Sequence, residues 1–445
     1  MNSVNRRKKF GLKNKNRHLY ILIAFLFFEY VRIQDSYFTF LAPFSIPMLL
    51  NIILLFLVVF RSRDLPKDGL IYLILAFWAL MVVHVPFATN NFHAFNATKS
   101  MFLTLIIVLS TTILVDTEFA LKKLFESIIY IVLLVSIWVV WNGGIGPGGF
   151  VRDENDVCLF LVVGLPFCWY FQMLEDVSKI KRWLARVTVI AAVIAIIATS
   201  SRGGFLGFAA VLGTALLFTR KPMRNILLSI IFSLFLGGLA LNFIPENYVA
   251  DMKTITDKDN STRNLRLLHW TTAWEIYKDN PVFGVGPQNY PWNSAHYFHL
   301  SPYFQEGAAG RSGRESHSLY FTLIPELGTI GTLIYLTLIL SFYRRGLSVR
   351  STLYGGRSAG RDSNSKIKNE KTKPNNETIF WFMTSLLVGM TGFLVSAAFI
   401  TVLYYPIFWN FVGFSIATWW IFIEAEKVPH AMQGRRINGG VCAAR

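Results

Sequence analysis

Long apolar runs separated by short polar segments dominate the chain. They lie near Leu19–Ile33, Pro43–Phe60, Gly69–Phe87, Met101–Val115, Leu124–Trp141, Val157–Leu174, Trp183–Thr199, Gly203–Thr219, Ile226–Phe243, His317–Phe342, Thr378–Ser396 and Tyr404–Ile423. A helix needs about 20 apolar residues to cross a bilayer. Helices are the expected spanning element, because a lipid-exposed backbone must satisfy its own hydrogen bonds. The pattern predicts an all-α polytopic membrane protein with about twelve transmembrane helices.

The polar segments predict an orientation and a domain order. Segments such as RSRDLPKD, DTEFALKK and EDVSKIKRW are rich in cations, whereas QDSYFT, NNFHAFNATKS and NGGIGPGG carry few, so the positive-inside rule places the basic N-terminus in the cytoplasm. The expected order is a cytoplasmic N-terminus (1–18), nine spans (19–243), one large outer loop with amphipathic helices (244–316), a tenth span (317–343), a cytoplasmic linker (344–376), two spans (377–424) and a cytoplasmic tail (425–445). The Gly, Ser, Asn and Lys content of residues 351–376 predicts a disordered segment.

Composition agrees with a membrane protein. The chain has 445 residues, of which 53% are hydrophobic, and this apolar content excludes a soluble protein. The net charge of +17 could indicate nucleic-acid binding, yet most Lys and Arg lie in short segments between apolar runs, where they orient the protein. Cys158 and Cys168 lie ten residues apart in one predicted helix, which is too far for a disulfide. We find no internal repeat of the kind that symmetric transporters carry.

Several arginines fall on the outer side, where the orienting rule disfavours cations: Arg152, Arg202, Arg263, Arg266, Arg311 and Arg314. Arg202 lies in TSSRGG, between two apolar runs with almost no loop between them. An arginine this close to hydrocarbon generally faces a partner or a polar cavity. Two interpretations stay open: a turn residue that extends to the membrane surface, or an anion site.

The outer loop contains a predicted helix with arginines and aromatic residues on one side. Asn260–Thr262 offers an N-cap, and the helix stops before Pro281. Helical spacing places Arg263, Arg266, Trp270, Trp274 and Tyr277 on one face. Guanidinium groups beside aromatic rings suit a ligand with phosphates and sugar faces. The alternative is an interfacial helix whose arginines meet lipid headgroups.

A histidine stands at the start of the tenth apolar run. Helical spacing predicts that His317, Phe321, Ile324, Gly328 and Gly331 share one face, which ends in two glycines and should press against another helix. A neutral imidazole near pH 7 can take a proton from an alcohol as a general base. The alternative is a structural histidine.

Acidic and amide side chains cluster before the sixth apolar run. Asp153 and Asn155 lie in FVRDENDVC with Glu154 and Asp156. These side chains could cap the helix, position an acceptor hydroxyl or solvate the turn. The sequence shows no spacing of histidines and carboxylates typical of a metal site, so no metal or other cofactor is expected.

At these residues the chain resembles the O-antigen ligase and polymerase superfamily of bacterial inner-membrane glycan transferases. The ligase pattern is His, then Asn, Ser or Gln, then nine residues and Gly-x-x-Gly, and it is met by His317, Ser318, Gly328 and Gly331. TSSRGG, STRNLRLLHW and GVGPQNY resemble further family landmarks in the family's order.

The resemblance implies a metal-independent, inverting transfer of a glycan from an undecaprenyl-pyrophosphate carrier to an acceptor hydroxyl at the periplasmic face. In this interpretation Arg202 and Arg266 bind the pyrophosphate and His317 deprotonates the acceptor. The other expected substrate contacts are Arg263, Arg314, Arg311, Arg152, Asp153, Asn155, Trp270 and Trp274.

The acceptor stays open at the level of sequence. A ligase transfers to lipid A core, a polymerase extends a carrier-linked glycan, and a related branch glycosylates proteins as an O-oligosaccharyltransferase. The histidine-to-glycine spacing favours the ligase, whereas GPGGFVRDEND also resembles the protein-glycosylating or exosortase-associated branch. From another class, a polytopic transporter would use charges at the midplane, whereas the charges here collect at the outer rim. A scaffold protein is the third class, but that function would not explain why arginines lie on the outer side.

Overall fold

The computed structural model describes residues 2–218, 261–305, 313–362 and 376–438, and in these ranges it is built from α-helices and short 3₁₀ turns without β-strands. The α-helices are α1 (Asn2–Val31), α2 (Ile33–Ser36), α3 (Ile46–Phe60), α4 (Gly69–His84), α5 (Asn91–Leu114), α6 (Glu118–Trp141), α7 (Glu154–Phe171), α8 (Lys179–Ala198), α9 (Arg202–Leu217), α12 (Ser261–Asp279), α13 (Tyr290–Tyr297), α14 (Leu319–Asp362), α15 (Glu377–Ser396) and α16 (Pro406–Asn438). The 3₁₀ turns are η1 (Thr39–Phe44), η2 (Ser62–Asp64), η3 (Gly149–Val151), η4 (Phe298–Leu300) and η6 (Ala397–Phe399).

Seven of the described helical segments are long and apolar enough to cross a membrane, and α4 and α9 are shorter apolar helices. The chain is therefore a multi-pass membrane protein. The predicted span Ile226–Phe243 lies outside the described residues, so the total of twelve stays a prediction.

Short polar side chains set where the helices begin. Asp68 caps α4 at the backbone N–H of Leu70, and Thr117 caps α6 at Ala120. Ser201 caps α9 and accepts from the Gly204 N–H at 3.2 Å. Each cap satisfies a backbone donor that the first helical turn leaves without a partner. The predicted break at Ser201 is confirmed by this cap.

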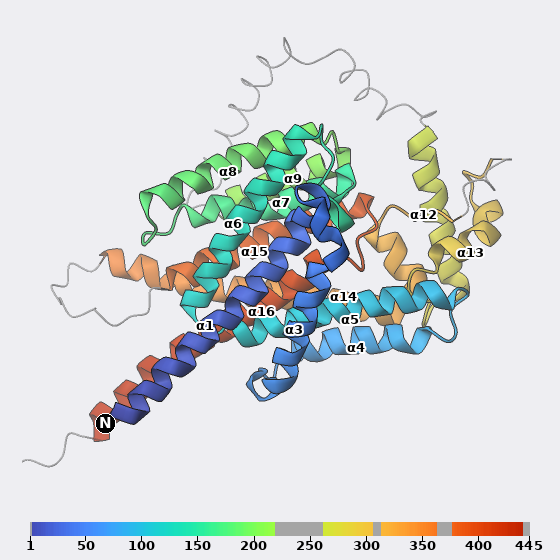
Figure 1. Cartoon of the computed structure of the whole chain (residues 1–445). Helices are drawn as coiled ribbons and strands as arrows, with labels where there is room; N and C mark the ends of the chain where they lie inside the picture. Colours follow the sequence, from blue (N-terminus) through green and yellow to red (C-terminus); the bar gives the residue numbers. More distant parts are fainter. Residues whose placement is uncertain (1, 219–260, 306–312, 363–375, 439–445) are drawn as a thin grey trace, which may run out of the picture.

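The core lies around α15, which packs against α7 and α9 (Figure 1). In α7, α15 and α16, 78% of the most apolar stretch is buried inside the protein, against 17% for the span that includes α3. Edge-to-face contacts join Phe125, Phe167 and Phe382, with ring centroids 5.2 to 5.9 Å apart. Because lipid is as apolar as the core, this packing is stabilised by close contact rather than by exclusion of water. α3 therefore lies at the periphery.

Three predicted boundaries are wrong. The segment NNFHAFNATKS, predicted as a loop, forms the first turns of α5, because Asn90 caps the helix at the His93 N–H. The last helix begins at Pro406 rather than Tyr404, since residues 400–405 form a connection after η6. α14 continues to Asp362, inside the stretch predicted as disordered. Val349 is buried and Leu353 packs against the core, so the packed part of the helix extends past the predicted end of the span at Phe342.

α14 is interrupted in the middle of its apolar run. Gly328 has φ 60° and ψ −162°, a conformation that only glycine adopts readily. The segment Pro281–Gly286 lies along the break, where the Gly286 N–H donates to the Glu326 carbonyl at 2.8 Å and the Thr329 N–H donates to the Pro281 carbonyl at 2.8 Å. These bonds satisfy backbone groups that the interruption would leave without partners inside the helix. The predicted continuous face from His317 to Gly331 is therefore wrong: Gly328 packs against a loop segment.

α12 and α13 stand at one end of the bundle, beside the ends of α4, α5 and α14 (Figure 1). Asn289 joins α13 to the α4–α5 turn, because its side-chain oxygen accepts from the Asn90 N–H at 2.7 Å. His84, in α4, contacts the segment Pro281–Gly286 that precedes α13, because its Nε2 lies 2.7 Å from the Phe283 carbonyl oxygen. These contacts hold α12 and α13 over the end of the bundle.

Candidate active site

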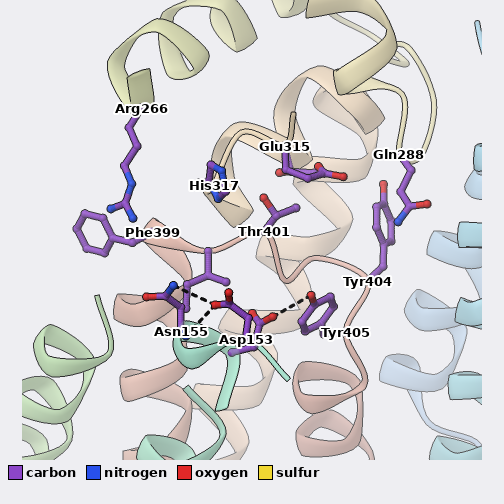
Figure 2. A pocket seen from close by; sticks show the side chains of 13 residues that line it. Asp153, Asn155, Arg266, Gln288, Glu315, His317, Phe399, Thr401, Tyr404 and Tyr405 are labelled. Atoms are coloured by element: carbon purple, nitrogen blue, oxygen red, sulfur yellow. Dashed lines mark hydrogen bonds between the residues drawn. The ribbon is translucent and has the colours of Figure 1, made fainter. Parts of the chain in front are cut away.

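A cavity of about 320 Å³ lies between α12 and the ends of the bundle helices (Figure 2). It is lined by Asp153, Asn155, Asp156, Arg266, Gln288, Glu315, His317, Thr322, Phe399, Ile400, Thr401, Tyr404 and Tyr405. The lining comes from five parts of the chain that are far apart in sequence. A concave site with several convergent polar groups is the usual form of a small-molecule site.

His317 precedes α14, which begins at Leu319, and its φ of 52° lies in the left-handed region. The neighbouring residues hold this conformation. The Ser316 hydroxyl donates to the Ser318 carbonyl at 3.0 Å, and the Trp270 indole donates to the Ser316 carbonyl at 3.1 Å. Trp270 also stacks on Phe321, with centroids 5.2 Å apart. A non-glycine residue held at positive φ in a cavity is typical of functional sites.

The surroundings of His317 favour the neutral imidazole. Burial lowers the pKa of His317, the Arg266 charge lowers it further, Asp153 acts in the opposite direction, and Arg314 adds a smaller lowering. The ring itself is open to the cavity. Among the described residues, no hydrogen-bond partner occupies either ring nitrogen. At neutral pH the ring can therefore accept a proton from a molecule in the cavity.

Arg266 reaches into the cavity from α12, with its guanidinium carbon 5.9 Å from the centre of the Phe399 ring (Figure 2). Burial lowers the pKa of Arg266, and the nearby charge of Arg202 lowers it as well. Burying the Arg266 guanidinium near a second cation is costly unless an anion binds it. In the described part of the chain no carboxylate pairs with Arg266, so this side of the cavity is suited to an anionic group.

Asn155 connects the starts of α7 and α9. Its side-chain amide donates to Asp153 at 3.0 Å, and its oxygen accepts from the Ser201 hydroxyl at 2.7 Å. Asp153 also caps α7 at the Asn155 N–H. Because Ser201 is the N-cap of α9, this chain of bonds fixes the turn that carries Arg202 relative to the cavity floor.

Glu326 supports the cavity from behind. It is fully buried and accepts from the backbone N–H of Gln288 at 2.8 Å, the N–H of Tyr290 at 3.0 Å and the hydroxyl of Tyr404 at 2.7 Å. A buried carboxyl group is tolerated when its oxygens are satisfied in this way. Glu326 thus ties the loop before α13 to the α15–α16 connection.

The predicted site residues divide into two groups. His317, Arg266, Asp153 and Asn155 line the cavity. Five others do not line the cavity and are exposed: Arg152, Arg202, Arg263, Arg314 and Trp274. Trp270 donates a hydrogen bond to the backbone beside His317. Arg311 lies outside the described residues.

Sequence reasoning missed the wall formed by Gln288, Thr401, Tyr404 and Tyr405. Gln288 lies inside GVGPQNY, which marked the segment without assigning the residue, whereas no short motif marks Thr401, Tyr404 or Tyr405. The two tyrosines before Pro406 interrupt an apolar run, and this interruption was the one sequence signal that could have indicated a functional segment there. In the described ranges, no group of three or more His, Cys, Asp or Glu side chains converges as metal ligands would.

Residues 187–336 match the family model described as O-antigen ligase. This match supports the predicted resemblance to the O-antigen ligase and polymerase superfamily. The matched stretch contains His317, Arg266 and Arg202, together with Glu326 and the break at Gly328. No curated protein matches the chain. In general terms, the match supports a glycosyltransferase-like activity with a lipid-linked glycan and an acceptor as partners.

Proposed function

We propose that the protein transfers a glycan from an undecaprenyl-pyrophosphate carrier to an acceptor hydroxyl at the periplasmic face of the bacterial inner membrane. The observation that carries the proposal is the placement of His317 and Arg266 on one cavity. A base without a protein partner and a cation without a carboxylate partner, both among the described residues, fit the two ends of a displacement at an anomeric carbon.

In the proposed reaction, the acceptor oxygen attacks the anomeric carbon while its proton passes to a ring nitrogen of His317. The bond from the anomeric carbon to the pyrophosphate oxygen breaks, and undecaprenyl pyrophosphate leaves with the electron pair. Arg266 stabilises the negative charge that builds on this leaving group, and Arg202 adds to the positive field. Direct displacement inverts the configuration. The proton then leaves His317 to water.

The histidine-to-glycine spacing favours lipid A core as the acceptor, which makes the protein a ligase. Extension of a carrier-linked glycan would make it a polymerase, and transfer to a protein hydroxyl an O-oligosaccharyltransferase. The three activities share the donor and the displacement, so one assay separates them. The purified protein is given an undecaprenyl-pyrophosphate oligosaccharide with each acceptor in turn, with EDTA present.

The decisive variant is His317→Ala. We expect a loss of about 10²- to 10⁴-fold in transfer rate, the usual contribution of a general base. His296→Ala, which removes an exposed histidine of α13 outside the cavity, is the matched control and should transfer at the wild-type rate. Undiminished transfer by a folded His317→Ala protein would remove the base assignment.

Arg266→Gln should lower the rate by about 10²-fold, because one fixed donor to the leaving group is lost. Arg266→Lys keeps the charge without the planar fork and should recover part of the rate. Equal rates for Arg266→Gln and the wild type would contradict the leaving-group role.

A further inference from the structure

Two tyrosines and one glutamine form a wall of the cavity that the proposed chemistry does not use. Tyr404 and Tyr405 come from the connection between α15 and α16, and Gln288 comes from the loop before α13. The Tyr404 hydroxyl donates to Glu326 at 2.7 Å, and the Tyr405 hydroxyl donates to Asp156 at 3.2 Å. Because both hydroxyls are bound by protein carboxylates, each tyrosine offers the cavity mainly the carbon surface of its ring.

Gln288 adds polar groups beside these rings. Its backbone is held at φ 51°, and its N–H is bound to Glu326 at 2.8 Å. Within the described residues its side-chain amide has no protein partner, so one carbonyl oxygen and two N–H donors remain for a ligand. Thr401 lies on the same wall (Figure 2). Aromatic carbon beside a free amide and a hydroxyl is complementary to a sugar, which has C–H groups on a ring face and hydroxyls at its edge.

One carboxyl group holds both parts of this wall. Glu326 accepts from Gln288 and from Tyr404 at the same time, which fixes the loop before α13 against the α15–α16 connection. A wall that is already ordered loses little entropy when a ligand binds. The subsite is therefore formed before the ligand arrives.

The position of the wall decides which substrate it fits. In Figure 2, Arg266 and Phe399 lie on one side, Gln288 and Tyr404 lie on the other, and His317 and Glu315 lie between them. Since Arg266 faces the leaving pyrophosphate in the proposed function, the far side of the base is where the acceptor enters.

We propose that Gln288, Tyr404 and Tyr405 bind a pyranose ring of the acceptor, so that the acceptor is a glycan rather than a protein. This inference rests on the proposed function for the assignment of the two sides, whereas the sugar subsite itself does not depend on transfer. The cavity of about 320 Å³ is near the lower end of small-molecule pockets, which agrees with one terminal sugar unit entering it beside the donor.

Binding is tested without a donor. Saturation-transfer NMR would be recorded on the full-length protein with the methyl pyranosides of glucose, galactose, mannose, rhamnose and N-acetylglucosamine. The detergent is a polyoxyethylene alkyl ether, because maltoside detergents carry pyranose rings. We expect saturation of ring C–H protons for at least one glycoside in the wild type and in Tyr405→Phe, and its loss in Tyr405→Leu. Tyr72→Leu, which replaces an exposed tyrosine of α4, is the control and should behave as the wild type.

Kinetics provide the second test. Tyr405→Leu should raise KM for a glycan acceptor about ten-fold while KM for the donor stays unchanged, and Tyr405→Phe should retain the wild-type value for both. Any of three results would overturn the inference. No glycoside is saturated, Tyr405→Leu gives the same signals as the wild type, or the protein transfers to a protein acceptor at a rate that Tyr405→Leu leaves unchanged. If no transfer occurs at all but the NMR signals follow the expected order, the proposed reaction fails and the sugar subsite stands.

Discussion

Charges of opposite sign near His317 act on the pKa of its imidazole in opposite directions. Burial and the charges of Arg266 and Arg314 lower the pKa of His317 from its ordinary value of 6.5, while Asp153 raises it. A general base must be neutral, so in the proposed reaction the transfer rate should rise with pH through this lowered pKa and level off above it. The acid limb of the rate profile therefore reports the charges around one ring.

Two substitutions should move that limb in opposite directions. Arg314→Gln removes a cation that disfavours the imidazolium, so the pKa of His317 increases and the limb shifts to higher pH. Asp153→Asn removes the carboxylate that favours the imidazolium, so the limb shifts to lower pH, while asparagine can still cap α7. Initial rates measured from acid to neutral pH decide the matter. Shifts of the same sign in both variants would contradict the assignment of the limb to His317.

The backbone at Gly328 gives a sharp stability test. An added Cβ would lie 2.4 Å from the Val282 carbonyl oxygen, in a conformation costly for any other residue. We expect Gly328→Ala to lower the free energy of unfolding by at least about 1–3 kcal/mol, measured as thermal unfolding in detergent.

Gly213→Ala is the matched control for this test. Gly213 lies in α9 with no atom within 4 Å of an added Cβ, so the substitution should be neutral or stabilise slightly. Equal unfolding temperatures for the two variants would show that the break tolerates a side chain.

At the scale of elements, α4, α14 and α16 are joined by a buried ion pair. Arg345 binds both Asp68 oxygens at 2.8 Å, and the Trp420 indole donates to the same carboxylate at 2.9 Å. Asp68 also caps α4, so one side chain sets where that helix begins and which helices it meets.

Arg345→Met should destabilise the protein by about 3–5 kcal/mol, because it leaves the Asp68 carboxylate buried without its cation. The double variant Asp68→Asn with Arg345→Met should recover most of this loss. Arg61→Met breaks the more exposed pair with Asp64 and should cost at most about 1 kcal/mol. Thermal unfolding of the three variants gives the comparison, and a double variant no more stable than Arg345→Met would contradict it.

Local patterns and non-local contacts explain what the sequence could predict. Apolar runs and capping residues located most helices, because both signals lie within a few residues of the boundary. His317 and Arg266 could be predicted from a short motif and an outward charge. The break at Gly328 could not, since its hydrogen-bond partner Pro281 lies 48 residues away from Thr329. Tyr404 and Gln288 were missed for the same reason: Glu326 brings them together from separate elements.

At the scale of the whole molecule, the predicted orientation places α13 on the periplasmic side of the inner membrane and η2 on the cytoplasmic side. Ala295 and Ser62 are exposed positions in these two elements. In a Cys442→Ala background, a membrane-impermeant maleimide added to intact cells freed of their outer membrane should label Ala295→Cys and leave Ser62→Cys unlabelled until the membrane is opened. Labelling of Ser62→Cys in sealed cells would reverse the orientation and place the His317 cavity at the cytoplasmic face.

The interruption of α14 also bears on biogenesis. During synthesis the insertion machinery meets Leu319–Leu353 as one continuous apolar stretch, and nothing in that stretch alone supplies partners for the backbone at Gly328. The partners in Pro281–Gly286 are synthesised first, and in the predicted orientation they are translocated to the periplasmic side before this stretch inserts. We therefore expect maturation of the cavity to include a late docking step, in which the translocated segment binds the backbone around Gly328.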